Sequence, residues 1–292
     1  MICYKNLKNN NMMGDNFMIN NNNVLRELID NDQPTVGTHM YSPWPGMVEV
    51  IGHTGAIDYI EFSGTYAPYD LFSLESFARA TDLFKHMTGM IKLDQEPRTY
   101  LAERAVGAGI PNLLFADLRT IDDAQEAADA MQPESPIAKK GSGIAGANAR
   151  RDTGYGATFY RDKQATLKNY MNDLEQGVLA VMIEKKEAVD NVEAMLSSVK
   201  RIDMVQFGPA DYSMSIGLPD QYDHPDVKKA DESIIKIALE HGVRPRIEIA
   251  QWEDAKPYVD LGVRDFCISA DIYIVAEFCK ASGDNLLKLL GR

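Results

Sequence analysis

Two carboxylates stand at the ends of apolar runs in this chain. Glu184 closes the run VLAVMIE (178–184), and Asp211 follows a second run in the segment FGPADYSMS (207–215). Two acids brought together at a site either raise each other's pKa or share a divalent cation. Two protein ligands, with room for water and substrate oxygens, are the usual arrangement around Mg²⁺ or Mn²⁺. The alternative is that one acid caps the helix that EKKEAVDN begins.

The elements that must position these acids are short apolar runs that alternate with longer amphipathic ones. Segments with helical spacing include 73–87, 120–132, 187–200 and 230–242. The strand-like runs number eight: 35–40, 57–62, 89–93, 112–116, 178–184, 203–207, 244–250 and 265–270.

This alternation predicts an α/β fold, a (β/α)8 TIM barrel with a closed, parallel, eight-stranded sheet. An open doubly wound sheet gives the same local pattern, but no GxGxxG turn opens any of the helices. In a closed barrel of this kind, residues that finish neighbouring strands converge on one mouth. Glu184 and Asp211 are therefore expected to meet there.

Length and composition allow one domain as readily as two, and they indicate a small-molecule substrate. The chain has 292 residues and 45% hydrophobic content, and one barrel of about 250 residues uses nearly all of it. We assign residues 23–292 to that domain and 1–22 to a low-complexity, asparagine-rich extension. The net charge of −13, without a basic block, argues against nucleic acid or an anionic membrane as partner.

The cysteine content and the N-terminal sequence favour the cytoplasm. Cys3, Cys267 and Cys279 show no metal-ligand spacing and no disulfide framework. No apolar run has the length of a membrane span, and the start lacks the features of a signal peptide. The segment 133–160, rich in Gly, Ala and Arg, is expected to be an ordered active-site excursion or a mobile lid.

A resemblance gives the two acids a more specific meaning. The segments VMIEKKEAVDNVEAML and VQFGPADYSMSIGLP closely resemble the V-x-I-E and G-P-x-D-L-S motifs of the HpcH/HpaI aldolase family, the metal-dependent 2-oxo-acid aldolases related to the citrate lyase β subunit. The resemblance runs from about residue 24 to 291. It implies a barrel of the phosphoenolpyruvate/pyruvate-domain type in a cytoplasmic homo-oligomer, commonly a hexamer, whose C-terminal helix (AEFCKASGDNLLKLLGR) packs on a neighbour.

The resemblance also assigns roles to residues of the motifs. Glu184 and Asp211 inherit the binding of Mg²⁺, Mn²⁺ or another divalent ion. Its implied substrate-binding residues are Lys92, Met182, Gly208, Pro209 and Ala210. The implied reaction makes or breaks a carbon–carbon bond through the enolate of a pyruvate-like 2-oxo acid, with the metal ion as the only cofactor.

Departures from the family pattern put its usual proton chemistry in doubt. Lys92 stands where the family has an arginine, and it keeps the charge but loses the two-pronged guanidinium. A Schiff-base role for Lys92 is redundant beside a metal pair. In SGTYAP, Tyr66 replaces the family's catalytic histidine and Ser63 its orienting acid. The glutamine of the first motif is Met182 here.

The sequence offers replacements for the missing proton carrier. His39, two positions beyond Gly37, is expected to point into the mouth, and Glu61 shares a strand face with Ser63. His39 as base and Glu61 as its orienter form one candidate, and a core histidine bonded to a structural acid is the alternative. For Arg246 and Glu248, which also share a face, we expect a structural ion pair inside the barrel.

Three functions remain open at this point. The first is a divalent-metal aldolase or lyase with an altered acid–base group. The second is another reaction through the same enolate, either decarboxylation of an oxaloacetate-like acid or condensation onto a carbonyl. The third is a barrel that binds a metal and an oxo acid without catalysis.

Overall fold

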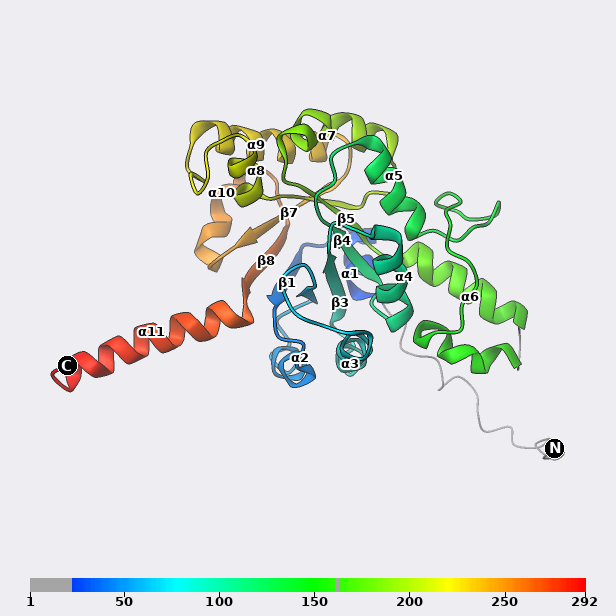
Figure 1. The fold of residues 1–292 in the computed structure, drawn as a ribbon, viewed down its shortest axis with the longest axis horizontal. Helices are drawn as coiled ribbons and strands as arrows, with labels where there is room; N and C mark the ends of the chain where they lie inside the picture. The colour runs from blue at the N-terminus through cyan, green and yellow to red at the C-terminus, as the bar shows by residue number, and fades with distance from the viewer. Residues whose placement is uncertain (1–22, 161–162) are drawn as a thin grey trace.

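The centre of the molecule is a closed barrel of eight parallel strands, paired in chain order from β1 to β8 and back to β1 (Figure 1). The computed structural model describes residues 23–160 and 163–292. The strands are β1 (Thr35–Met40), β2 (Tyr59–Ser63), β3 (Thr88–Leu93), β4 (Asn112–Phe115), β5 (Leu179–Ile183), β6 (Met204–Phe207), β7 (Arg244–Ile249) and β8 (Asp265–Ala270). The predicted (β/α)8 barrel is confirmed.

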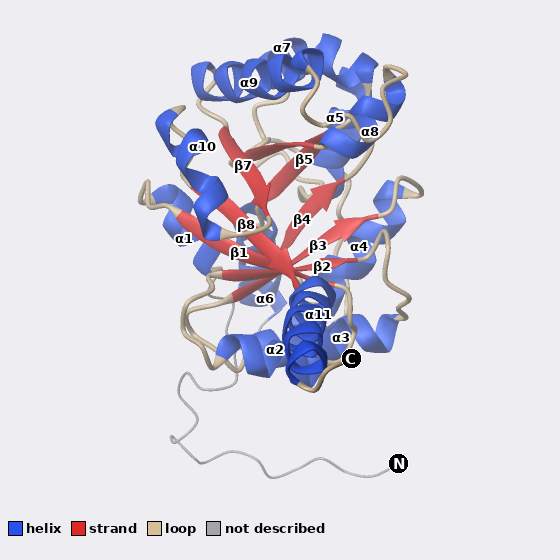
Figure 2. Ribbon diagram, turned by 90° about the vertical axis from the view of Figure 1, so that its left-hand side faces the viewer, coloured by secondary structure: helices blue, strands red, loops and turns tan. Residues whose placement is uncertain are grey.

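Helices surround the barrel on its outside, as Figure 2 shows, except for α1 at its N-terminal end and α11, which extends away from it. They are α1 (Val24–Asp30), α2 (Pro45–Gly52), α3 (Leu71–Thr81), α4 (Arg98–Ala108), α5 (Ile121–Ala130), α6 (Lys163–Gln176), α7 (Lys186–Ser198), α8 (Pro209–Ser215), α9 (Pro225–Glu240), α10 (Lys256–Asp260) and α11 (Asp271–Leu289). None of the helices in the described part of the chain combines the length and apolar character that crossing a bilayer requires.

Helix α3 ends six residues before the predicted boundary. The periodicity of 73–87 predicts one continuous helix, but the helix ends at Thr81. The chain then places the ring of Phe84 over Gly52 of α2, where a Cβ atom would come within 2.5 Å of the ring. Tertiary packing of this aromatic ring therefore overrides the local helical pattern.

Hydrophobic residues fill both sides of the sheet. The larger cluster lies between strands and helices and includes Phe62, Phe77 and Phe115, all nearly fully buried. A second cluster fills the barrel interior, and its members are Leu25, Tyr59, Met90, Leu114, Val178, Ala180, Met182 and Met204. The barrel is thus a packed core rather than a pore, and its chemistry is confined to one end.

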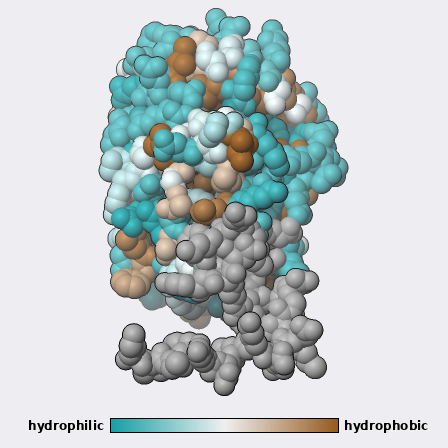
Figure 3. All heavy atoms as spheres, turned by 90° about the vertical axis from the view of Figure 1, so that its right-hand side faces the viewer, coloured by the Kyte–Doolittle hydropathy of each residue, from teal (hydrophilic) through white to brown (hydrophobic). Residues whose placement is uncertain are grey.

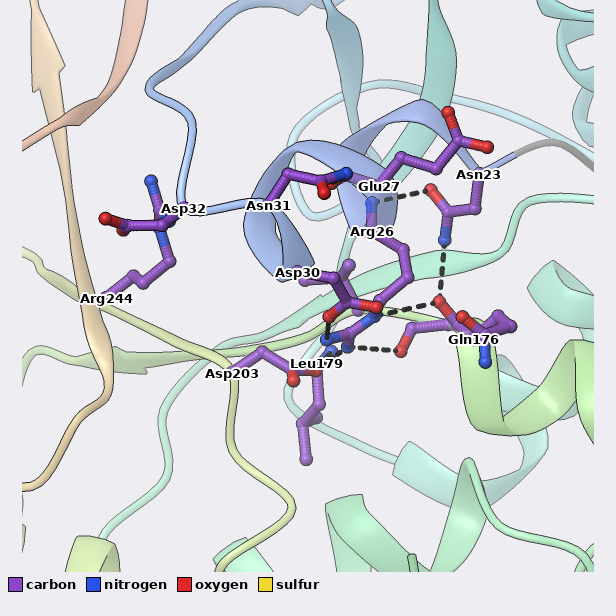
Figure 4. Close-up of polar contacts among 12 residues, drawn as sticks. Asn23, Arg26, Glu27, Asp30, Asn31, Asp32, Gln176, Leu179, Asp203 and Arg244 are labelled. Carbon is purple, nitrogen blue, oxygen red and sulfur yellow. Dashed lines mark hydrogen bonds and ion pairs between the residues drawn. The ribbon is translucent and has the colours of Figure 1, made fainter.

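Helix α1 closes the N-terminal end of the barrel through polar contacts (Figure 4). The side-chain amide of Asn23 donates to Asn112 Oδ1 of β4 at 2.7 Å. Arg26 pairs with Asp203 at 2.5 Å and donates to the Gly177 carbonyl at 3.1 Å. These buried groups satisfy one another, so this end of the barrel is structural.

The segment 133–160 does not cover the mouth of the barrel, contrary to the expected excursion or lid. Its Arg150 and Arg151 bind Glu103 and the Ala108 carbonyl of α4, and it continues through a 3-10 segment (Arg151–Tyr160) toward α6. The reason is topological. A segment after a helix returns to the N-terminal face, whereas the mouth is built from loops that follow strands. The surface on this side is mostly hydrophilic (Figure 3).

Helix α11 extends away from the barrel instead of packing along it (Figure 1). Of its residues only Asp271 is buried, because its carboxylate accepts the backbone N–H groups of Tyr41 and Ser42. Its exposed hydrophobic residues are Ile272, Tyr273, Ile274, Val275, Phe278, Leu286, Leu287 and Leu289. This chain alone leaves that apolar surface uncovered.

Candidate active site

A pocket opens at the C-terminal ends of the strands and gathers nearly all of the residues expected at the site. Its walls include His39, Ser63, Tyr66, Lys92, Met182, Glu184, Gly208, Pro209, Ala210, Asp211 and Glu248. Glu61 is the exception, since its side chain is fully buried. Residues from strands far apart in sequence therefore meet as the barrel geometry requires.

Glu184 and Asp211 form the acidic wall of this pocket. Glu184 follows β5 and accepts the backbone N–H of Asp117 through Oε1 at 2.8 Å. Burial raises the pKa of Glu184 above its ordinary value, and the negative charge of Asp211 adds to this effect while Lys92 opposes it. Asp211 lies in the first turn of α8 and pairs with Lys185 Nζ at 2.5 Å.

The backbone between the two strands is shaped to bring these acids together. A Cβ atom at Gly208 would lie 2.6 Å from Glu184 Cβ and 2.9 Å from its Oε2. Only glycine therefore lets the turn before α8 approach Glu184 this closely. Two carboxylate donors, one after β5 and one in the first turn of α8, fit a hard divalent cation. Within residues 23–160 and 163–292, no three His, Cys, Asp or Glu side chains gather as metal ligands, so the candidate set is this pair.

Lys92 occupies the wall between the acidic pair and β2. It stands beside Ser63 in the β2–β3 register, and its Nζ lies 3.2 Å from the Tyr66 hydroxyl and 4.8 Å from the ring centroid of Tyr66. Burial lowers the pKa of Lys92, but Glu184 and Tyr66 outweigh burial, so the pKa is raised overall. Lys92 is an ammonium ion, and a Schiff-base nucleophile would need the opposite shift.

His39 and Glu61 are neighbours, as strand alternation predicts. They face each other in the β1–β2 register, and His39 Nδ1 lies 3.1 Å from Glu61 Oε1. Burial alone would raise the pKa of Glu61, but Arg246 and His39 bring it down to about 2. Glu61 is therefore an anion that holds His39 in place.

The expected ion pair between Arg246 and Glu248 is wrong. Arg246 pairs with Glu61 at 2.5 Å, whereas Glu248 approaches His39 Nε2 at 3.3 Å and accepts from Gln206. Two inward-facing residues on one strand are about 6.6 Å apart along it, so each finds partners on other strands. Gln206 was missed, although it is the one polar residue in the run MVQF.

Two tyrosines on the rim, Tyr41 and Tyr273, were also missed, and they form a row with the predicted Tyr66. The rings of Tyr41 and Tyr66 are stacked with centroids 5.9 Å apart, and Tyr273 of α11 meets Tyr41 edge-on at 5.8 Å. All three line the pocket. Alternation along β1 was the available signal, since Tyr41 lies two residues after His39.

Comparison with known proteins identifies the class to which this barrel and site belong. A model of the HpcH/HpaI aldolase/citrate lyase family matches residues 88–255, and the chain belongs to this family. The 2-keto-3-deoxy-L-rhamnonate aldolase of Shigella sonnei is 27% identical over 215 residues, which cover 73% of this chain and 74% of that protein.

Solved structures share the fold over nearly the whole chain. A HpcH/HpaI aldolase/citrate lyase family protein from Burkholderia cenocepacia has a TM-score of 0.78 at 24% identity, covering 90% of this chain and 99% of that one. A HpcH/HpaI aldolase from Desulfitobacterium hafniense has a TM-score of 0.75 at 18% identity, covering 90% and 96%. These similarities show a common barrel.

Proposed function

We propose that this chain is a divalent-metal-dependent, aldolase-like carbon–carbon lyase that acts through the enolate of a pyruvate-like 2-oxo acid. The observation that carries this proposal is that Glu184 and Asp211 line one pocket with the Lys92 ammonium. An acidic pair beside a fixed cation suits a substrate that carries both a carboxylate and a keto oxygen. Membership of the HpcH/HpaI family supports the reaction class.

Glu184 and Asp211 are the residues that would hold the ion, Mg²⁺ or Mn²⁺. When bound, such an ion supplies Lewis-acid polarisation of the keto oxygen. The Asp117 N–H fixes one oxygen of Glu184, and Gly208 leaves room beside it. Lys185 Nζ pairs with the carboxylate of Asp211.

The remaining residues bind the substrate and handle its protons. Lys92 is placed to bind the substrate carboxylate, and the backbone of Gly208, Pro209 and Ala210, with Met182, forms the adjoining surface. His39, which lies 3.1 Å from Glu61 and 3.3 Å from Glu248, belongs to the proposed proton-handling group. Tyr66 stands where the family has its histidine, and its hydroxyl near Lys92 makes it the competing candidate.

Decarboxylation of an oxaloacetate-like acid, or condensation onto a carbonyl, is the second candidate function. The observation that favours it is the phenol of Tyr66 in place of a histidine base, because a reaction that generates the enolate by loss of CO₂ needs no base there. Release of CO₂ from oxaloacetate above the metal-only background separates it from aldol cleavage.

Exchange of the methyl protons of pyruvate tests the proposal. In D₂O, deuterium should enter the methyl group only when the protein and Mn²⁺ or Mg²⁺ are both present. Absence of exchange in that mixture contradicts enolate chemistry and favours a barrel that only binds a metal and an oxo acid. Panels of aldehydes and oxo acids then divide cleavage from condensation.

Assembly into a homo-oligomer, on the hexameric pattern of the family, is part of the same proposal. The apolar surface of α11, with Phe278 70% exposed and Leu289 81% exposed, is suited to packing on a neighbouring copy. A monomeric mass by light scattering at micromolar concentration would contradict this. The free thiols of Cys267 and Cys279 suit the reducing cytoplasm that we propose as location.

A further inference from the structure

Five polar side chains form a closed ring in the barrel, next to the mouth pocket. His39 Nδ1 lies 3.1 Å from Glu61 Oε1, and Glu61 Oε2 lies 2.5 Å from Arg246 Nη2. Arg246 Nη1 donates to Gln206 Oε1, and Gln206 Nε2 donates to Glu248 Oε2 at 3.3 Å. Glu248 Oε2 closes the ring at 3.3 Å from His39 Nε2.

The ring favours a charged imidazole at His39. Both nitrogens of His39 face carboxylate oxygens, which only accept, and a neutral imidazole has just one donor nitrogen. Burial would lower the pKa of His39, but the Cys267 sulfur and the Glu61 and Glu248 carboxylates outweigh it and raise that pKa well above its ordinary value. Tyr41 also lies within electrostatic reach of His39.

The two carboxylates of the ring differ in what they can reach. Glu61 has no exposed side-chain surface and lies between two cations, His39 and Arg246. Glu248 has 48% of its side chain exposed and lines the pocket. Glu248 is therefore the carboxylate of the ring that can pass a proton between His39 and the pocket.

We propose that Glu248 is the residue that exchanges protons with the substrate, and that His39 and Glu61 are positioning residues behind it. This inference rests on the proposed function and deepens it. In the cleavage direction, Glu248 takes the proton of the substrate hydroxyl and the carbon–carbon bond breaks. The hydroxyl carbon becomes an aldehyde, and the bonding electron pair passes into the enolate. Glu248 then returns the same proton to the enolate carbon, so no further reactant is consumed.

The surrounding residues hold this ring in one geometry. Gly37 has no Cβ, and one would come within 2.2 Å of the Tyr59 ring. The Tyr59 ring therefore fits there, and its hydroxyl lies 2.7 Å from Arg246 Nε. Moving a charged side chain from water into the protein interior costs several kcal/mol, so apolar side chains would stabilise the barrel at least as well if the ring were purely structural. Buried charges at an active-site mouth are instead typical of functional groups.

Methyl-proton exchange of pyruvate with Mn²⁺ in D₂O tests the role of Glu248. We expect Glu248→Ala to lose a factor of about 10² to 10⁴ in rate, and added formate to restore part of it by replacing the lost carboxylate. Glu193→Gln, which alters an exposed carboxyl group of α7 outside the pocket wall, should keep the wild-type rate. A folded Glu248→Ala protein that exchanges as fast as wild type overturns the proposal, and so does a loss that formate leaves unchanged.

A second measurement separates failure of this inference from failure of the proposed function. If the wild-type protein shows no exchange, the enolate chemistry is wrong. Nitrogen NMR of His39 then tests whether His39 is held between Glu61 and Glu248. We expect both ring nitrogens to be protonated at neutral pH, and the His39 titration to move to lower pH in Glu248→Gln. A His39 titration that is the same in both proteins overturns the proposed contact between His39 and Glu248.

Discussion

On the β5–β6 side of the mouth, Glu184 is a buried carboxylate whose pKa is raised by burial and by Asp211, with Lys92 opposing. On the β1, β2 and β7 side, Glu61 is more deeply buried, yet Arg246 and His39 bring its pKa to about 2. Burial therefore does not decide the state of an acid in this barrel, whereas the number of cations in contact with it does. The β5–β6 side, the first side, is suited to binding an added cation. The β1, β2 and β7 side, the second side, already contains the cations Arg246 and His39.

The largest expected effect is the loss of metal binding when the first side is altered. Glu184→Ala and Asp211→Ala should each abolish Mn²⁺ binding in calorimetry, because each removes one of only two charged ligands. Glu248→Gln is the matched control and should bind Mn²⁺ as wild type does. Undiminished affinity in both alanine variants would show that the metal site is wrongly assigned.

The next effect concerns proton transfer on the second side. His39→Gln should keep the fold and the bound metal, since glutamine fits the space and still forms hydrogen bonds. Turnover should fall by a factor of up to about 10² to 10⁴, the usual share of a general acid–base group, because Glu248 loses the imidazole that positions it.

Tyr66→Phe is the control for His39, because a phenol with an ordinary pKa of about 10 is a poor base near neutrality. If His39→Gln keeps the metal-dependent rate while Tyr66→Phe loses it, the tyrosine has taken over the role of the family's histidine. In that case the comparison between the two sides no longer holds.

Replacing Lys92 is expected to have a smaller effect than replacing a metal ligand or His39. Lys92→Gln should raise KM for the 2-oxo acid about 10- to 100-fold, the value of one hydrogen bond to a charged group. Lys92→Arg keeps the charge and supplies a planar fork, so its KM should stay closer to wild type. Equal KM values for Lys92→Gln and wild type would remove Lys92 from the binding site.

The smallest expected effect is a pH dependence of stability. A group whose pKa is raised by folding stabilises the protein fully below its unfolded pKa, which for His39 is about 6.5, and that contribution is lost as pH rises through the folded pKa. The difference between the free energies of unfolding of wild type and His39→Gln should therefore decrease as the pH rises above about 6.5. Urea titrations measure it, and a difference that widens toward alkaline pH is the contrary result.

Much of the fold and part of the site follow from local sequence patterns. Eight apolar runs alternating with helices predict the barrel, because each β-then-α unit carries its own signal. Strand parity places His39 and Glu61 inside, and consecutive strands in a barrel are neighbours, so their contact is also predictable. Glu184 and Asp211 share the mouth for the same reason.

The remaining features depend on register, which sequence parity does not give. Parity turns Arg246 and Glu248 inward, but only the stagger of the closed barrel brings Arg246 to Glu61 and Glu248 to His39. The composition of the segment 133–160 favours a position at the mouth. Its position after α5 sends it to the opposite end.

The Mn²⁺ dependence of pyruvate methyl exchange in D₂O, compared among wild type, Glu184→Gln and Glu248→Gln, tests the division of labour between the two sides most directly. Our account predicts that Glu184→Gln moves the midpoint to higher Mn²⁺ concentration. It predicts that Glu248→Gln keeps the wild-type midpoint but reaches a much lower plateau. Exchange by wild type without any divalent ion, or the same midpoint shift in both variants, would contradict it.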